Sequence, residues 1–259
     1  MVFLATFYID AGHGGEKPGA KRTFQGVTYY EKDFNLQIAM KVREFLLTVS
    51  PAQTIYMYRT TDKNGNLSVR GQDAKNKGAD VFISIHNNSI TSPSICGTLT
   101  LYPKTFTAGW ETSKNFASTM QQTLIDYLNT QGWNMDDKGL MTWSNSSGEL
   151  GVFSGSAPVP SCLVECAFMS CDGDIQKLLN PDFITDVSYA IALGAVTWLN
   201  KQGFNLSTPV RYPKKEEEQP FHPTRGVFFP LLFLGSFAVF LYYLNKNGTS
   251  FNKWIREVL

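Results

Sequence analysis

Hydrophobic positions along the chain follow two alternating patterns as far as Asn200. Five short apolar runs have the length and composition of buried strands; they cover 3–9, 54–59, 80–86, 97–102 and 161–165. Four longer segments repeat apolar residues every three to four positions, as helices with one buried face do; they cover 32–49, 67–77, 110–130 and 182–200. The alternation predicts one α/β domain with a mostly parallel, twisted sheet covered by helices on both faces.

The first run lies within Met1–Asp10, which has neither the basic residues nor the small-residue cleavage site of a signal peptide. We therefore expect it to form the opening strand. In parallel sheets the functional site lies at the carboxyl ends of the strands. Asp10–His13, His86 and Glu165 all stand at or just beyond predicted strand ends.

The pattern changes after residue 203. Residues 204–225 hold four prolines and a Lys-Lys-Glu-Glu-Glu run, which predicts an extended linker. Residues 226–244 carry no charge, and at about 1.5 Å per residue a helix of that length spans the hydrocarbon core of a bilayer. We expect a globular domain over 1–203 and a linker over 204–225. A transmembrane helix over 226–244 and a short polar and basic tail over 245–259 would follow.

Composition narrows the choice of partners. The chain has 259 residues, of which 43% are hydrophobic, and a formal net charge of +1, so no nucleic-acid partner is expected. Its four cysteines include no Cys-x-x-Cys pair, and a thiolate zinc site is not predicted. Cys162, Cys166 and Cys171 are interpreted as buried core thiols, and a disulfide between Cys166 and Cys171 is left open.

Two of the three histidines stand in settings that suit metal binding. His13 lies in an Asp-Ala-Gly-His-Gly-Gly stretch, and His86 ends a strand in Ser-Ile-His-Asn-Asn. Glu31 opens the first long helix. Two imidazoles and one carboxylate are a common ligand set for catalytic zinc, with a fourth position open. His222 lies between prolines in the linker and has no such setting.

Glu165 follows the apolar run Cys162-Leu163-Val164. Burial raises the pKa of a carboxyl group and suits it to general acid and base catalysis. The alternative is a carboxylate satisfied by backbone N–H groups or by an arginine. The residues by themselves therefore indicate a metal-dependent hydrolase of the α/β class.

Five ordered motifs resemble the zinc-dependent N-acetylmuramoyl-L-alanine amidases. They are Ile9–Gly15, Glu31–Leu36, Tyr58–Asp62 with Leu67–Arg70, Ala79–Asn88, and Leu163–Ser170. The resemblance covers about Phe7 to Asn200. Lys17 departs from it, because the family usually has an aspartate there, and Cys166 and Cys171 replace residues that are often small or Asn.

The resemblance implies a reaction and a role for each residue. His13, Glu31 and His86 would hold Zn²⁺, and Glu165 would move a proton from water to the leaving amine. The bond cut would join N-acetylmuramic acid to L-alanine in peptidoglycan, with Asn88 and Arg70 as candidate substrate contacts. Two alternatives remain open: a non-catalytic wall-binding or structural membrane protein with this fold, and a zinc peptidase acting on wall stem peptides.

The expected span at 226–244 implies a lipid membrane as a partner. It predicts a location either in the internal membrane or virion of a bacteriophage or in a bacterial cell membrane facing the wall, with a role in wall lysis or remodelling or in phage entry or release. Residues 110–130 form the only helix predicted between His86 and Glu165, so no large autoinhibitory insertion is expected.

Overall fold

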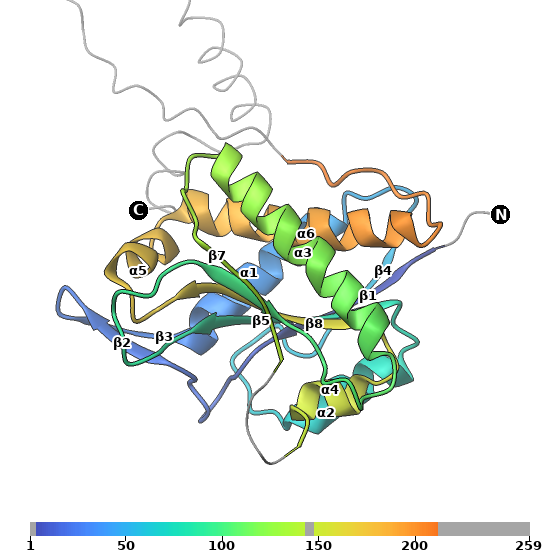
Figure 1. Ribbon diagram of the computed structural model, residues 1–259, viewed down its shortest axis with the longest axis horizontal. Coiled ribbons are helices and arrows are strands. Elements are labelled where there is room, and N and C mark those ends of the chain that lie inside the picture. The colour runs from blue at the N-terminus through green and yellow to red at the C-terminus, as the bar shows by residue number, and fades with distance from the viewer. Residues whose placement is uncertain (1–3, 143–147, 212–259) are drawn as a thin grey trace, which may run out of the picture. The chain divides into compact units, whose positions relative to one another are not determined.

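The computed structural model describes residues 4–142 and 148–211, which form an α/β domain around a six-stranded sheet of order β4-β1-β5-β8-β6-β7 (Figure 1). The sheet strands are β1 (Thr6–Ala11), β4 (Thr54–Met57), β5 (Val81–Asn88), β6 (Thr98–Leu101), β7 (Asp137–Met141) and β8 (Ser161–Phe168). Strands β4, β1, β5 and β8 are mutually parallel, whereas β6 is antiparallel to β8 and parallel to β7. The predicted α/β class with a mostly parallel sheet is confirmed.

Helices cover both faces of the sheet, as the periodicity predicts. They are α1 (Glu31–Leu46), α2 (Leu67–Asn76), α3 (Trp110–Thr130), α4 (Gly151–Ser156), α5 (Asp172–Leu178) and α6 (Pro181–Lys201). Helix α6 packs against α1 and α3 on one face, and α2 packs against α4 on the other (Figure 1). Both faces are therefore shielded from water, as a parallel sheet requires.

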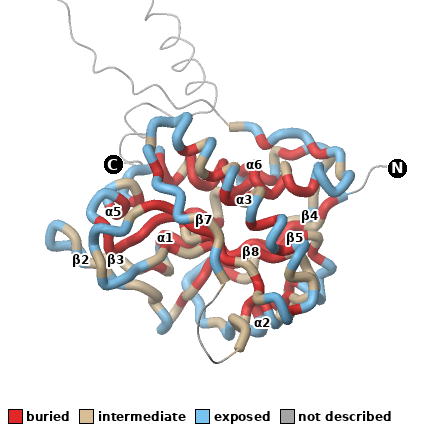
Figure 2. Tube along the Cα trace, viewed as in Figure 1, coloured by how far each residue is buried: buried red, intermediate tan, exposed pale blue. Residues whose placement is uncertain are grey.

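Alternate side chains of the strands supply two separate cores. In β1, Phe7 and Ile9 belong to the cluster beneath α1, α3 and α6, while Tyr8 belongs to the cluster beneath α2 and α4. Burial of each such side chain contributes about 1.5–3 kcal/mol, which holds the register of the strands. Figure 2 shows the resulting band of buried residues along the sheet. The same alternation turns Asp10 toward the α2 side.

Short elements account for most differences from the predicted pattern. The hairpin of β2 (Lys21–Phe24) and β3 (Val27–Tyr30) is largely exposed and carries no continuous apolar run. The six-residue α4 lies between His86 and Glu165, so the expectation of a single helix there is wrong. Strands β5 and β8 also continue past His86 and Glu165, which places both side chains within strands.

Within the described residues, the segment after residue 203 also contacts the domain. Leu206 is buried, Ser207 contacts the backbone of Ser50, and Arg211 pairs with Asp186. These contacts hold the start of the predicted linker against the domain.

The predicted membrane location is corrected by the structure. No helix within residues 4–142 and 148–211 is long and apolar enough to cross a bilayer. Helix α6 has the required length, but it carries charged residues and packs into the core of the domain. The segment 226–244, on which the prediction rested, lies outside the described residues, as do the tail at 245–259 and His222.

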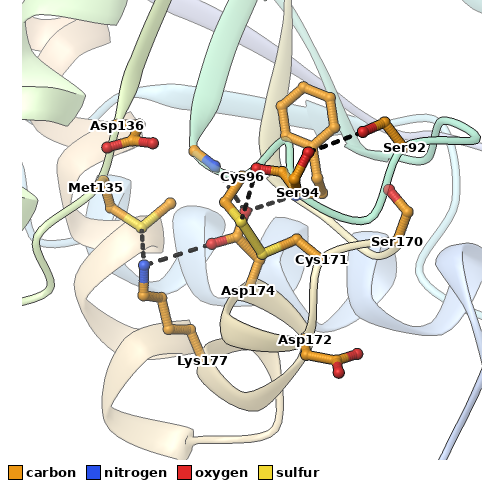
Figure 3. Close-up of a disulfide and its surroundings, with 12 residues drawn as sticks. Ser92, Ser94, Cys96, Met135, Asp136, Ser170, Cys171, Asp172, Asp174 and Lys177 are labelled. Atoms are coloured by element: carbon orange, nitrogen blue, oxygen red, sulfur yellow. Dashed lines mark hydrogen bonds and ion pairs between the residues drawn. A yellow bond between two sulfur atoms is a disulfide. The ribbon is translucent and has the colours of Figure 1, made fainter.

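A disulfide joins Cys96, in the segment after β5, to Cys171, in the turn after β8 (Figure 3). Asp174 sits beside it and accepts hydrogen bonds from the backbone N–H groups of Gly97 and Phe168, at 2.7 and 2.9 Å. Cys162 and Cys166 are free and buried, as predicted, whereas the interpretation of Cys171 as a core thiol is wrong because it is bonded to Cys96. A Cys166–Cys171 bond does not form, because Cys166 faces the core beneath α1, α3 and α6, whereas Cys171 packs in the opposite cluster.

Replacing both bonded cysteines, Cys96→Ser with Cys171→Ser, is expected to lower the free energy of unfolding by about 2–4 kcal/mol. The bond closes a loop across a sequence separation of 75 residues, which restricts the unfolded chain. Urea unfolding with and without dithiothreitol measures the effect. Reductant should destabilise the wild type and leave the double variant unchanged; equal stability of the two oxidised proteins would refute this prediction.

Candidate metal centre

Three side chains from separate elements converge at the carboxyl end of the sheet. His13 lies in the loop after β1, Glu31 begins α1, and His86 lies in β5. His13 Nε2 lies 3.0 Å from Glu31 Oε2, and His86 Nδ1 lies 2.9 Å from Glu31 Oε1. The candidate ligand atoms of the three residues all lie within 4.8 Å of one another. The structure thus brings together the three residues that the sequence suggested as ligands.

Glycines allow this close approach. A Cβ atom added to Gly12 would lie 2.3 Å from the His86 ring, and one added to Gly19 would lie 2.3 Å from Glu31 Oε2. His13 itself has a φ of 61°, in the left-handed region that non-glycine residues seldom occupy. Such strained positions cluster at functional sites, where surrounding contacts hold them.

Glu31 is fixed by donors from several directions. Its Oε2 accepts a hydrogen bond from the backbone N–H of Ala20, and its Oε1 accepts from Asn35 Nδ2 and the backbone N–H of Asn87. Burial by itself would raise the pKa of this carboxyl group, but the hydrogen bonds and charges of His13 and His86 hold it well below its usual range. The side chain is therefore kept as a carboxylate.

Two buried arginines hold the loop that carries His13. Arg59 donates to the carbonyls of Ala11 and Gly12 at 2.8 and 2.9 Å. Arg70 forms an ion pair with Asp10 at 2.7 Å and donates to the carbonyls of Ala11 and His13. Arg70 is only 2% exposed, so its position supports the loop rather than contact with a substrate.

The role of Arg59 was missed from the sequence. The residue follows β4, far along the chain from His13, and three of its four carbonyl partners belong to other segments. An Arg beyond a strand end beside a glycine-rich loop was the available signal, but backbone acceptors leave no pattern in a sequence.

Glu165 lies beside His86 on the neighbouring strand. The two residues are register partners in β5 and β8, so their side chains emerge on the same face of the sheet. Glu165 Oε2 is buried and has no hydrogen-bond partner among the described residues. Burial raises the pKa of this carboxyl group well above its usual value, and the negative charge of Glu31 raises it further. The alternative of a carboxylate satisfied by an arginine or by backbone N–H groups finds no support at Oε2.

One pocket of about 470 Å³ is lined by the three candidate ligands, His13, Glu31 and His86, and by Glu165. Asn88 also lines it, whereas Arg70 does not. The remaining wall includes several apolar side chains that lie in or next to α2, α4, β6 and β8; they are Leu67, Leu101, Leu150, Val152 and Leu163. A polar end with convergent titratable groups and an apolar end are typical of a substrate-binding site.

The donor set fits a catalytic zinc ion better than a structural one. Zinc sites of the catalytic kind use three protein ligands from histidine and carboxylate side chains and leave one position open. His13, Glu31 and His86 supply that set at the edge of an open pocket. A second cluster, Cys96, Cys171 and Asp174, offers no thiolates because its two cysteines are bonded to each other.

Comparisons with known proteins show which family the chain resembles. A family model described as N-acetylmuramoyl-L-alanine amidase matches residues 7–196. The sporulation-specific N-acetylmuramoyl-L-alanine amidase of Bacillus subtilis strain 168 is 31% identical over 203 residues, which are 78% of this chain and 69% of that protein. An endolysin of Bacillus phage SPP1 is 27% identical over 223 residues, or 85% of this chain and 74% of the endolysin. The crystal structure of an N-acetylmuramoyl-L-alanine amidase from Clostridium difficile 630 matches with a TM-score of 0.67 at 30% identity, covering 77% of this chain and 99% of that one.

Proposed function

Because the chain belongs to the N-acetylmuramoyl-L-alanine amidase family, we propose that it hydrolyses the amide between N-acetylmuramic acid and L-alanine in peptidoglycan with the help of bound zinc. His13, Glu31 and His86 would hold the ion, and Glu165 would transfer the proton. One observation carries the proposal: the three candidate ligands share one pocket with the partly buried Glu165, whose Oε2 has no hydrogen-bond partner among the described residues.

Hydrolysis of an amide needs an activated water and a protonated amine leaving group. When bound, zinc supplies Lewis acidity that polarises a carbonyl group and eases the deprotonation of water. Glu165 then accepts a proton from the attacking water, a C–O bond forms, and the C–N bond breaks as the same carboxyl group returns the proton to the nitrogen. Because Glu165 Oε2 has no partner within residues 4–142 and 148–211, that oxygen is available for both transfers.

The surroundings suit Glu165 to this exchange. Its raised pKa brings the carboxyl group closer to the operating pH, where it can both accept and release a proton. His86 stands next to it across the β5–β8 pair, so a substrate carbonyl near the candidate ligands would lie close to the carboxyl group.

The decisive experiment combines metal analysis with cleavage of purified peptidoglycan sacculi by the full chain. We expect one zinc ion per chain and new L-alanine amino termini on the released stem peptides, with the glycan strands left intact; this cleavage should be lost with a chelator and restored by added zinc. Bound zinc with cleavage only within stem peptides would favour the peptidase alternative. Neither zinc nor cleavage would favour a non-catalytic wall-binding or structural protein and would overturn the proposal.

A further inference from the structure

An apolar wall lines the same pocket as Glu165 and His13. Its members are Leu67 of α2, Leu101 of β6, Leu150 just before α4, Val152 of α4 and Leu163 of β8. Four of the five are buried or half-buried, but Leu67 is 46% exposed. An exposed leucine at the entrance of a pocket offers apolar surface that a substrate can cover.

Strand pairing sets the floor of this wall. Leu163 and Glu165 are two positions apart in β8, so both project from the same face of the sheet. Leu101 of β6 is the register partner of Leu163. Val152 of α4 belongs to the same buried cluster as these two leucines. The apolar floor therefore begins immediately beside the carboxyl group.

Close packing of two helices sets the rim. A Cβ atom added to Gly71 of α2 would lie 2.1 Å from the carbonyl oxygen of Val152, and one added to Gly155 of α4 would lie 2.3 Å from that of Ser68. Glycine at both positions lets α2 and α4 touch backbone to backbone. This contact brings Leu67, at the start of α2, to the pocket beside Leu150, which directly precedes α4.

The direction of proton transfer decides which part of the substrate meets this wall. In the proposed reaction Glu165 delivers its proton to the amide nitrogen, so that nitrogen lies at the carboxyl group. The nitrogen belongs to the alanine residue, whose side-chain methyl is two bonds away from it. The acyl side of the bond faces the candidate ligands instead.

We propose that the wall formed by Leu67, Leu101, Leu150, Val152 and Leu163 binds the side-chain methyl of the residue that supplies the leaving amine. The inference rests on the proposed function and assigns the residues that would select alanine over glycine or serine at this position. Glycine would leave the wall uncovered, and a serine hydroxyl would lose hydration against side chains that provide no hydrogen-bond partner.

The test compares synthetic disaccharide–peptide substrates that differ only in having L-alanine or glycine after the muramic acid. The wild type is expected to favour L-alanine in kcat/KM by about 10-fold or more, the usual range for one methyl group in an apolar pocket. Leu67→Ala and Leu163→Ala should reduce this ratio several-fold, mainly by slowing cleavage of the L-alanine substrate. Leu163→Met, which keeps an apolar side chain, should retain it.

Leu47→Ala provides the matched control, because Leu47 is also a half-exposed leucine, 55% exposed at the end of α1, and lies outside the pocket. Its ratio of kcat/KM for the L-alanine substrate to kcat/KM for the glycine substrate should equal that of the wild type. A wild type that cleaves both substrates equally well, or a ratio unchanged in Leu67→Ala and in folded Leu163→Ala, would overturn the inference and leave the proposed function standing. A wild type that releases no L-alanine amino termini from either substrate or from sacculi would overturn both.

Discussion

Glu165→Gln is expected to reduce the rate of peptidoglycan amide cleavage by about 10²–10⁴-fold, the usual contribution of a positioned general acid and base. The amide has nearly the shape of the carboxyl group but cannot accept and return a proton. Zinc content should stay at the wild-type level, because Glu165 is not among the clustered ligand atoms of His13, Glu31 and His86. Release of L-alanine amino termini from sacculi and metal analysis of the same samples measure both effects.

The pH dependence of stability tests the protonation state of Glu165 in the folded protein. In the metal-free protein the raised pKa of Glu165 keeps the folded carboxyl group neutral at a pH where the unfolded one is ionised. The folded state then binds more protons than the unfolded state, so wild-type stability falls as pH rises from the ordinary glutamate pKa toward the folded one. Gln has no such dependence.

Urea unfolding of metal-free samples should therefore show that the free energy of unfolding of Glu165→Gln, relative to that of the wild type, is higher at about pH 8 than at about pH 5. A folded variant with retained turnover would remove Glu165 from the reaction. A stability difference that is independent of pH would show instead that the carboxyl group is ionised in the metal-free fold.

His86→Ala is expected to abolish detectable cleavage and to weaken zinc binding by more than ~100-fold. Loss of a residue that only supports a metal ligand typically costs 10–100-fold in affinity or activity, and loss of a ligand itself should cost more. His86 also contacts Glu31 Oε1 at 2.9 Å, so its removal loosens a second candidate ligand. Zinc affinity is measured by competition with a chromogenic chelator, and activity is measured on sacculi.

His222→Ala is the matched control for this variant. It removes the third histidine of the chain, which lies outside the described residues and has no predicted role. Zinc affinity and turnover should match those of the wild type. If His86→Ala kept wild-type zinc affinity while His222→Ala lost it, the ligand set proposed here would be incorrect.

The amino-acid sequence by itself predicted the α/β class, the main helices and the candidate ligands. Each depends on local patterns: the apolar spacing in α1 and α3, the short apolar run in β5, and the glycines around His13. The ordered motifs also indicated the amidase family, which the match over residues 7–196 confirms. Periodicity is visible in a sequence because burial requires an apolar residue at every third or fourth position of a helix. A strand covered on both faces requires apolar residues along its whole length.

Tertiary structure alone decided the features that depend on residues far apart in the chain. Cys171 forms a disulfide with Cys96, 75 positions away. It does not pair with nearby Cys166, because Cys166 and Cys171 lie on opposite faces of the sheet. Arg59 holds the His13 loop through backbone carbonyls, which every residue carries and no sequence pattern marks. The apolar wall beside Glu165 likewise needs α2, α4, β6 and β8 to meet, and their meeting follows from the packing of the whole sheet rather than from any local pattern.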